Sequence, residues 1–277
     1  MSIDKKTILI TGCSSGIGYH CAKRIEEEQR YRLIVTARKD EDIQRLISEG
    51  FEVVKMDMSE SASVQKGFKR VLAKTGGELY ALFNNAGFGQ PGAVEDLSRD
   101  ALKEQFETNV FGVIELTNLA LKVFRKQKKG KIIQNSSVLG FVAFKYRGAY
   151  SASKFALEAL SDTLRLELTG SNVHISLIEP GPIKTDFRKN AFKKFLKYIN
   201  VDESPHYQAH QKSVERFKSD KDDPFTLSSE AVFQSLSKIL ETKNPKDRYR
   251  VTIPTKLFWI LRRILPVKVL DMIISRI

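Results

Sequence analysis

The sequence predicts a single α/β domain, in which a doubly wound parallel sheet carries helices on both faces. Three observations lead to this fold class. Short apolar runs alternate with amphipathic helical stretches along the chain, which is typical of a parallel sheet. A glycine-rich turn joins the first apolar run to the first helical stretch. The chain has 277 residues and 42% hydrophobic content, enough for one large core, and no linker or repeat marks a second domain.

The strands are expected where apolar and β-branched residues cluster in short runs. The first run, Thr7–Thr11, has the composition of a strand buried on both faces. Five further runs resemble it, and a seventh is weaker. They are Leu33–Ala37, Glu52–Met56, Ala81–Asn84, Lys131–Asn135, Ile175–Ile178 and, as the seventh, Tyr249–Thr252. The longest of the intervening helices is expected from about Arg99 to Arg125, where apolar residues recur at helical spacing.

The turn after the first strand contains Gly12, Gly16 and Gly18, and a helical pattern follows from Ile17 to about Glu28. Gly12 permits a tight turn, Gly16 lets the backbone approach a pyrophosphate, and Gly18 lets the helix pack close to the strand. The negative charge of a pyrophosphate would then meet the helix N-terminus. The sequence therefore predicts a dinucleotide site at the edge of a Rossmann-type sheet.

Tyr150 and Lys154 are four residues apart, so they share one face of a helix. An ammonium group beside a phenol lowers the pKa of that phenol. The usual pKa of a phenol is about 10, so a phenol that exchanges protons at pH 7 needs a pKa lower by about 3. Lys154 supplies part of this change, and a cationic cofactor ring would supply the rest. Ser137, upstream of the pair, offers a hydroxyl to a substrate oxygen.

These motifs resemble those of the short-chain dehydrogenases/reductases over about residues 6–190, and more loosely to the C-terminus. The segment from Thr11 to Gly18 is similar to the family's cofactor motif, and Asn84-Asn85-Ala86-Gly87 to its Asn-Asn-Ala-Gly element. The resemblance implies a catalytic set of Asn109, Ser137, Tyr150 and Lys154. It implies cofactor contacts at Gly12, Ser14, Ser15, Gly16, Ile17, Gly18, Arg38, Asp57, Asn85, Ala86, Gly87, Tyr150, Lys154, Pro180, Gly181, Ile183 and Thr185. It also implies that Asn109 distorts its helix and anchors a water.

The charge after the second strand favours NADP(H) over NAD(H). That strand ends at Ala37, and Arg38 follows where an NAD site usually has an acidic residue. A cation at this position suits the 2′-phosphate of NADP. Asp57 follows the third strand, and the resemblance implies that it touches the adenine. Alternatively, Asp57 caps the helix that starts near Ser59 or Glu60.

The expected activity is hydride transfer between NADP(H) and a carbonyl or alcohol of a lipophilic substrate, such as an aldehyde, a retinoid or a steroid. Residues 186–225 are the expected lid, because Phe187–Ile199 has the apolar spacing of an amphipathic helix. Phe88, Phe141, Phe144 and Tyr146 either surround the substrate or belong to ordinary packing. A catalytically silent NADP-binding sensor or scaffold is the alternative, but all four catalytic positions are filled. The C-terminal resemblance favours the retinol/17β-hydroxysteroid dehydrogenase-like branch.

A catalytic domain of residues 1–255 is expected to precede an amphipathic tail of residues 256–277, which Pro266 should interrupt. The tail has no apolar run long enough to span a bilayer. Its regular cations and Trp259 suit a helix at a membrane surface, and the net charge of +13 favours anionic headgroups. Packing of the tail on the domain or on a partner subunit is the other interpretation.

The cysteines, the histidines and the positive charge limit the compartment and the ligands that are expected. Cys13 and Cys21 are expected to be reduced, and the start of the chain lacks an apolar leader, so a cytoplasmic protein is expected, with peripheral membrane contact left open. No nucleic-acid motif accompanies the positive charge. His206 and His210 are expected at the surface, and no metal site is predicted. In the family that the chain resembles, the helices starting near Arg99 and Ala152 often pair across a homodimer.

Overall fold

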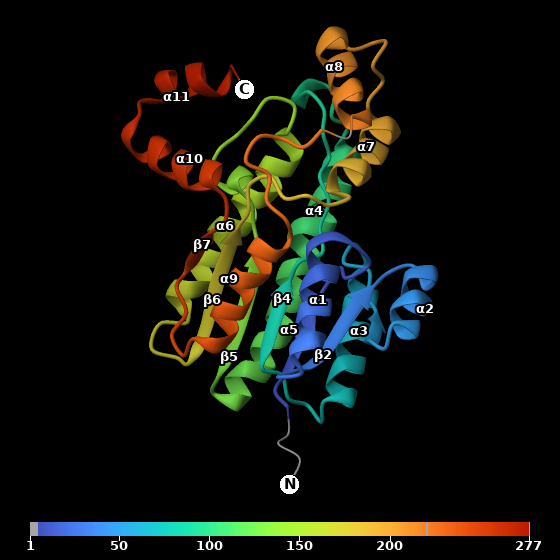
Figure 1. Cartoon of the computed structure of the whole chain (residues 1–277), viewed down its shortest axis with the longest axis vertical. Coiled ribbons are helices and arrows are strands. Elements are labelled where there is room, and N and C mark those ends of the chain that lie inside the picture. Colours follow the sequence, from blue (N-terminus) through green and yellow to red (C-terminus); the bar gives the residue numbers. More distant parts are fainter. Residues whose placement is uncertain (1–4, 220, 277) are drawn as a thin grey trace.

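The computed structural model describes residues 5–219 and 221–276, which form a seven-stranded parallel sheet between two layers of helices (Figure 1). The strand order is β3-β2-β1-β4-β5-β6-β7. The strands are β1 (Thr7–Ile10), β2 (Arg32–Ala37), β3 (Glu52–Lys55), β4 (Ala81–Asn84), β5 (Gly130–Asn135), β6 (Val173–Glu179) and β7 (Arg248–Arg250). The predicted fold class is confirmed, and each expected strand is present.

The helices cover both faces of the sheet. One layer consists of α1 (Gly16–Glu28), α2 (Asp40–Ser48) and α9 (Glu230–Glu241), and the other of α3 (Ser61–Lys74), α5 (Gly112–Gln127) and α6 (Gly148–Glu167). Successive strand residues face opposite layers, as the period of two requires. In β1, Ile8 and Ile10 pack in the first layer's core and Leu9 in the second. Because both faces are covered, the central strands β1 and β4 are mostly apolar, whereas the edge strand β7 has the sequence Arg-Tyr-Arg.

The longest expected helix contains a π-turn. Helix α4 (Arg99–Phe106) passes into the π-turn η2 (Glu107–Phe111), which continues as α5. Asn109 lies in this turn, and its side chain binds the backbone of Phe88 twice. Its Nδ2 donates to the carbonyl of Phe88 (2.9 Å), and its Oδ1 accepts from the same residue's N–H (3.1 Å). The helix is thus distorted at Asn109, and such π-turns frequently occur at functional sites.

Two pairs of helices extend beyond the carboxyl end of the sheet (Figure 1). One pair, α7 (Phe187–Tyr198) and α8 (Tyr207–Lys218), falls in the expected lid. The other, α10 (Ile253–Ile264) and α11 (Val267–Ile274), follows β7, with Pro266 between the two helices.

The tail helix α10 begins three residues before the expected boundary at residue 256. The seventh strand was expected to reach Thr252, but Thr252 caps α10 by accepting the N–H of Thr255 with its hydroxyl. Both threonines are buried, so the start of α10 belongs to the packed domain. Among the described residues, no helix is long and apolar enough to cross a lipid bilayer.

The two lid histidines are not simple surface residues, which corrects the prediction. His210 is fully buried, and its Nε2 lies 2.6 Å from Oδ2 of Asp96. His206 is partly exposed, and its Nε2 lies 2.6 Å from Oε1 of Glu95. Both rings also pack against Tyr146. They attach α8 to the turn η1 (Val94–Asp96). Within residues 5–219 and 221–276, no group of three or more potential metal ligands is found.

Candidate active site

The glycine-rich turn after β1 has a backbone that only small residues adopt easily. Gly12 and Gly16 have φ angles of +69° and +60°. A Cβ on Gly12 would lie 2.7 Å from Cα of Ala86. Ser15 is the N-cap residue of α1, yet its side chain makes no capping hydrogen bond, and no acidic residue stands in the first turn. The leading N–H groups of α1 are therefore available to an anion such as a pyrophosphate.

The segment after β4 is tied to this turn by side-chain hydrogen bonds. Thr11 Oγ1 accepts from the N–H groups of Asn85 and Ala86, both at 3.0 Å. The Nδ2 of Asn85 donates to the carbonyls of Thr11 (3.0 Å) and Gly12 (3.1 Å). The winding of the sheet reverses between β1 and β4, and ligands of such sheets bind outside the strands at this point.

Asn135, the last residue of β5, links the glycine-rich turn to helix α6. Its Nδ2 donates to Oδ1 of Asn85 (2.9 Å), and its carbonyl accepts from Nζ of Lys154 (2.6 Å). Sequence reasoning does not single out this residue. The available indication is its position at the carboxyl end of a predicted central strand, where site residues of α/β sheets collect.

Tyr150, Lys154 and Ser137 lie together at the carboxyl end of the sheet. Ser137 follows β5 and is buried, whereas Tyr150 and Lys154 share one face of α6. The Nζ of Lys154 is 5.7 Å from the centre of the Tyr150 ring. Burial raises the pKa of Tyr150 to about 12, although the Ser137 hydroxyl beside it acts in the opposite direction. The lowered phenol pKa expected from Lys154 is therefore not found in the protein alone, because burial outweighs the hydrogen bond with Ser137.

The cation of Lys154 is itself held in a buried polar network. Burial lowers the pKa of Lys154 to about 8, and the carboxylate of Glu158, one turn further along α6, acts against this. Glu158 accepts hydrogen bonds from the Ser136 hydroxyl and from Nη2 of Arg248, the latter at 2.9 Å. The negative charge of Glu158 therefore helps Lys154 to remain charged.

Asn109 reaches the same helix through Ser153. Its Nδ2 is 3.2 Å from Oγ of Ser153, which in turn donates to the carbonyl of Tyr150 (2.7 Å). A Cβ on Gly87 would lie 3.1 Å from Oδ1 of Asn109. The π-turn and the start of α6 are thus coupled directly, so all four residues of the predicted catalytic set are brought together.

Two basic residues lie near the expected adenosine end of the site. Arg38 follows β2 and is exposed, and no acidic side chain pairs with it among the described residues. Arg45 donates to the carbonyl of Ser14 (2.6 Å) and also pairs with Glu49 (2.9 Å). Arg38 is therefore a cation that is available to a ligand, whereas Arg45 supports the turn.

Asp57 makes a turn of its own and does not cap α3. Its Oδ1 accepts from the N–H (3.0 Å) and the hydroxyl (2.8 Å) of Ser59. The N-cap of α3 is Glu60, which makes no side-chain capping bond. The alternative interpretation of Asp57 as a helix cap is therefore wrong.

The segment after β6 closes over the glycine-rich turn. The carbonyl of Pro180 accepts the N–H of Val138 (2.8 Å), which ties the segment to the residue after Ser137. A Cβ on Gly181 would lie 2.1 Å from Oγ1 of Thr252. Ile183 forms an isolated bridge with Leu227. Thr185 lies over the turn, since a Cβ on Gly16 would lie 3.3 Å from Cβ of Thr185.

The aromatic residues expected around a substrate divide into separate groups. Phe187 packs edge-on against Tyr150, with ring centres 5.4 Å apart. Phe141 and Phe144 pack with the tail helix residue Phe258, and Tyr146 packs with the lid histidines. Phe88 carries the Nζ of Lys194 over its ring, 4.7 Å from the ring centre. The lid residue Phe187 therefore packs directly on Tyr150, whereas Phe141, Phe144 and Tyr146 take part in ordinary packing.

Glu104 on α4 holds the lid helix α7. It accepts hydrogen bonds from Lys194, Lys197 and Tyr198. Burial raises the pKa of Glu104, but these three hydrogen bonds outweigh it and bring the pKa to about 2. A carboxyl group whose pKa is lowered in the folded state stabilises that state above its ordinary pKa of 4.5, and this stabilisation is lost as the pH falls toward 2.

We expect Glu104→Gln to lower the free energy of unfolding at neutral pH by about 1 kcal/mol, and therefore to lower the melting temperature. The difference between wild type and variant should shrink as the pH falls below about 4.5. Thermal melts of both proteins over a pH series measure this difference. Glu78→Gln, at an exposed position without an ion pair among the described residues, serves as the control. A difference that stays constant with pH would contradict the assigned role of Glu104.

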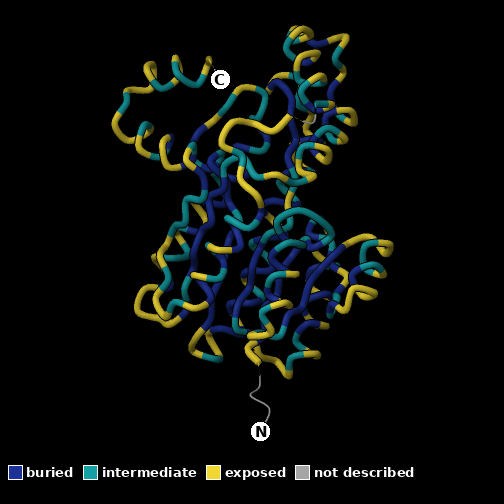
Figure 2. Tube along the Cα trace, in the orientation of Figure 1, coloured by how far each residue is buried: buried dark blue, intermediate teal, exposed yellow. Residues whose placement is uncertain are grey.

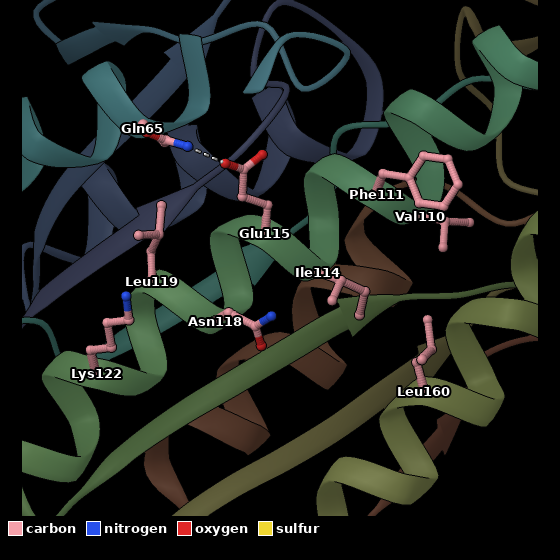
Figure 3. A pocket seen from close by; sticks show the side chains of 9 residues that line it. All are labelled: Gln65, Val110, Phe111, Ile114, Glu115, Asn118, Leu119, Lys122 and Leu160. Atoms are coloured by element: carbon pink, nitrogen blue, oxygen red, sulfur yellow. Dashed lines mark hydrogen bonds between the residues drawn. The ribbon is translucent and has the colours of Figure 1, made fainter. Parts of the chain in front are cut away.

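A surface groove of about 490 Å³ lies away from these residues, between α3, α5 and α6 (Figure 3). It is lined by Gln65, Val110, Phe111, Ile114, Glu115, Asn118, Leu119, Lys122 and Leu160. None of these is a predicted site residue, and Phe111 and Leu160 are exposed by 54% and 42%. The groove belongs to the face on which the family resemblance expects dimer contacts, so it is not assigned to substrate.

Comparison with known proteins agrees with this geometry. Residues 6–195 match the family described as short chain dehydrogenase. The uncharacterized oxidoreductase YbbO of Escherichia coli (strain K12) is 39% identical over 271 residues, covering 98% of this chain and 94% of that protein. Retinol dehydrogenase 8 of Homo sapiens is 35% identical over 214 residues, covering 74% of this chain and 66% of that protein.

Solved structures show the same fold. The crystal structure of a short chain dehydrogenase/reductase from Burkholderia phymatum, in complex with NAD, superimposes with a TM-score of 0.77 at 25% identity. The match covers 99% of this chain and 96% of that one. The family match, the relatives and the arrangement of the site residues agree, and this chain is an oxidoreductase that belongs to the short-chain dehydrogenase family.

Proposed function

We propose that this protein transfers hydride between NADP(H) and a carbonyl or alcohol carbon of a lipophilic small molecule. One observation supports the proposal above all. A serine, a tyrosine and a lysine converge at the carboxyl end of the sheet, beside a helix N-terminus that no side chain caps. This arrangement combines a proton donor with a place for a dinucleotide, which carbonyl reduction requires.

The chain's own residues would manage the proton and the substrate oxygen, and NADP(H), when bound, supplies the hydride. Tyr150 is protonated at neutral pH because burial raises its pKa to about 12, so it can donate a proton to a carbonyl oxygen. Ser137 would orient that oxygen through its hydroxyl. Lys154 donates to the carbonyl of Asn135, and its other N–H groups remain available to ribose hydroxyls.

The residues present fit a dinucleotide phosphate. Gly12 and Gly16 adopt positive φ, and the N-terminus of α1 offers N–H groups to the pyrophosphate. Arg38 is exposed without an acidic partner among the described residues, which suits the 2′-phosphate that distinguishes NADP from NAD. Resemblance to the family adds Asp57 as an adenine contact and Thr185 as a nicotinamide contact.

Two observations favour a lipophilic substrate. Phe187 at the start of the lid packs on Tyr150, and Gly89 beside it leaves room, since a Cβ there would lie 2.8 Å from Cζ of Phe187. The relative named retinol dehydrogenase 8 points to the same class of molecule. An apolar surface with few polar groups is typical of a site for such ligands.

We expect NADPH-dependent turnover with at least one aldehyde, ketone or retinoid in a panel that also includes small polar carbonyl compounds. Loss of NADPH absorbance measures turnover, and NADH is tested in parallel. Turnover that is fastest with apolar substrates and NADPH would support the proposal. Tight NADPH binding without turnover across the panel would contradict it and favour a catalytically silent sensor or scaffold.

A further inference from the structure

Helix α10 presents an unpartnered apolar stripe to solvent. Four apolar residues recur at positions i, i+4, i+7 and i+11, so they lie along one side of the helix. They are Ile253, Leu257, Ile260 and Ile264, and we call them the tail stripe. Their exposed fractions are 63%, 50%, 48% and 67%. Figure 2 shows α10 and α11 mostly in the colours of exposed and intermediate residues, apart from the buried core. A continuous stripe of this kind marks an interaction surface, unlike single exposed apolar residues.

The other side of α10 is already used for packing. Phe258 is buried and meets Phe144 edge-on, with ring centres 5.4 Å apart. Val138 belongs to the same cluster, and Leu261 and Leu270 pack against it. The helix is therefore held on the domain by one face, and the tail stripe cannot be buried by the domain at the same time.

The tail that carries the stripe is positively charged. Residues 253–276 contain five cations and one acidic residue, Asp271. The cations are Lys256, Arg262, Arg263, Lys268 and Arg276. None forms an ion pair with another described residue. Lys256 lies four residues before Ile260 and Arg263 three residues after it, each about one helical turn away, so they border the stripe. Trp259 lies between the guanidinium groups of Arg250 and Arg263, whose Cζ atoms are 3.9 and 4.0 Å from the centre of its ring.

We propose that the tail stripe docks on the anionic surface of a lipid bilayer. An exposed apolar face bordered by cations, on a helix that also carries a tryptophan, is the composition of a helix that lies in a membrane interface. The net charge of +13 attracts anionic headgroups. A second copy of the chain is a poorer occupant, because pairing two stripes would bring Lys256 and Arg263 toward the same cations of the partner.

Docking in this way would bring the active site close to the bilayer. The inner face of α10 packs on Val138 and Phe144, which lie between Ser137 and Tyr150 in the chain. A lipophilic substrate could then pass from the membrane to the site without crossing water. This consequence rests on the proposed function, whereas the docking itself does not.

Co-sedimentation with vesicles tests the docking. We expect the protein to bind vesicles of phosphatidylcholine with phosphatidylglycerol, not vesicles of phosphatidylcholine alone, and to be released by salt. Leu257→Glu should reduce the bound fraction roughly ten-fold or more, because a carboxylate replaces an inserting side chain. Lys256→Glu should weaken binding as well. Leu166→Glu, at a leucine of α6 that is 64% exposed, is the matched control and should bind like wild type.

Activity and size measurements separate the outcomes. All three variants should reduce a water-soluble carbonyl substrate at the wild-type rate, whereas Leu257→Glu should be slower with a substrate dissolved in the vesicles. Vesicle binding without any turnover would contradict only the proposed function. Absence of binding at low salt would overturn the docking proposal. The docking proposal would also be overturned if Leu257→Glu bound vesicles like wild type. The same holds if the only effect of Leu257→Glu were to convert a dimer to a monomer in light scattering.

Discussion

Tyr150→Phe is expected to lower turnover by about 10²–10⁴-fold, the usual contribution of a positioned proton donor. The substitution removes only the hydroxyl, and the remaining ring can still pack against Phe187. NADPH binding should stay close to wild type, because Lys154 keeps its hydrogen bond to Asn135. The turnover number with the best panel substrate and the dissociation constant of NADPH measure the two effects separately.

Tyr146→Phe is the matched control for this prediction. Tyr146 lies four residues before Tyr150 and outside α6, and its hydroxyl is 3.4 Å from Nδ1 of His206. This variant should keep most of its turnover. If Tyr150→Phe kept wild-type turnover, or if both variants lost it equally, Tyr150 would not be the proton donor.

Arg38→Asp is expected to reverse the preference between the two nicotinamide cofactors. The KM for NADPH should rise about 10- to 100-fold, since a hydrogen bond to a charged group is lost and a repulsive charge is gained. The KM for NADH should fall, because a carboxylate at this position can receive the ribose 2′-hydroxyl. Initial rates over a series of each cofactor concentration measure both changes.

Two further variants distinguish this role from a general effect of charge. Arg38→Gln should lose affinity for NADPH without gaining affinity for NADH, because it removes the cation and adds no carboxylate. Arg125→Asp changes charge equally at an exposed position near the end of α5, and both KM values should stay unchanged. A wild-type enzyme that already prefers NADH would show that Arg38 is only a solvated loop residue.

Much of the fold and of the site could be predicted because it depends on local pattern. The apolar runs specify the strands, and the glycine spacing specifies a turn with positive φ at Gly12 and Gly16. Ser137 lies at the site because it follows the carboxyl end of β5, and the start of α6 and the π-turn bring Tyr150, Lys154 and Asn109 to the same edge of the sheet. The family resemblance predicted that Asn109 distorts its helix, and Asn109 lies in the π-turn.

Other features depend on residues that are distant in the chain. The burial of His210 requires Asp96 as a partner, more than a hundred positions away. The role of Asn135 depends on its contacts with both Asn85 and Lys154, which no spacing reveals. The pKa of Tyr150 follows from burial by the whole domain, which a pair of residues in sequence cannot express.

The sequence by itself determined the order and type of the elements and the glycine-rich turn, because each depends on spacing within one segment, and the family resemblance predicted the catalytic set. Only the tertiary structure decided which aromatic residue stands on Tyr150, how Glu104 and His210 hold the lid, and which side of α10 remains exposed. An amphipathic pattern states that a helix has an apolar face. Whether that face is covered depends on the surface available nearby, and α10 has more apolar surface than the domain can cover.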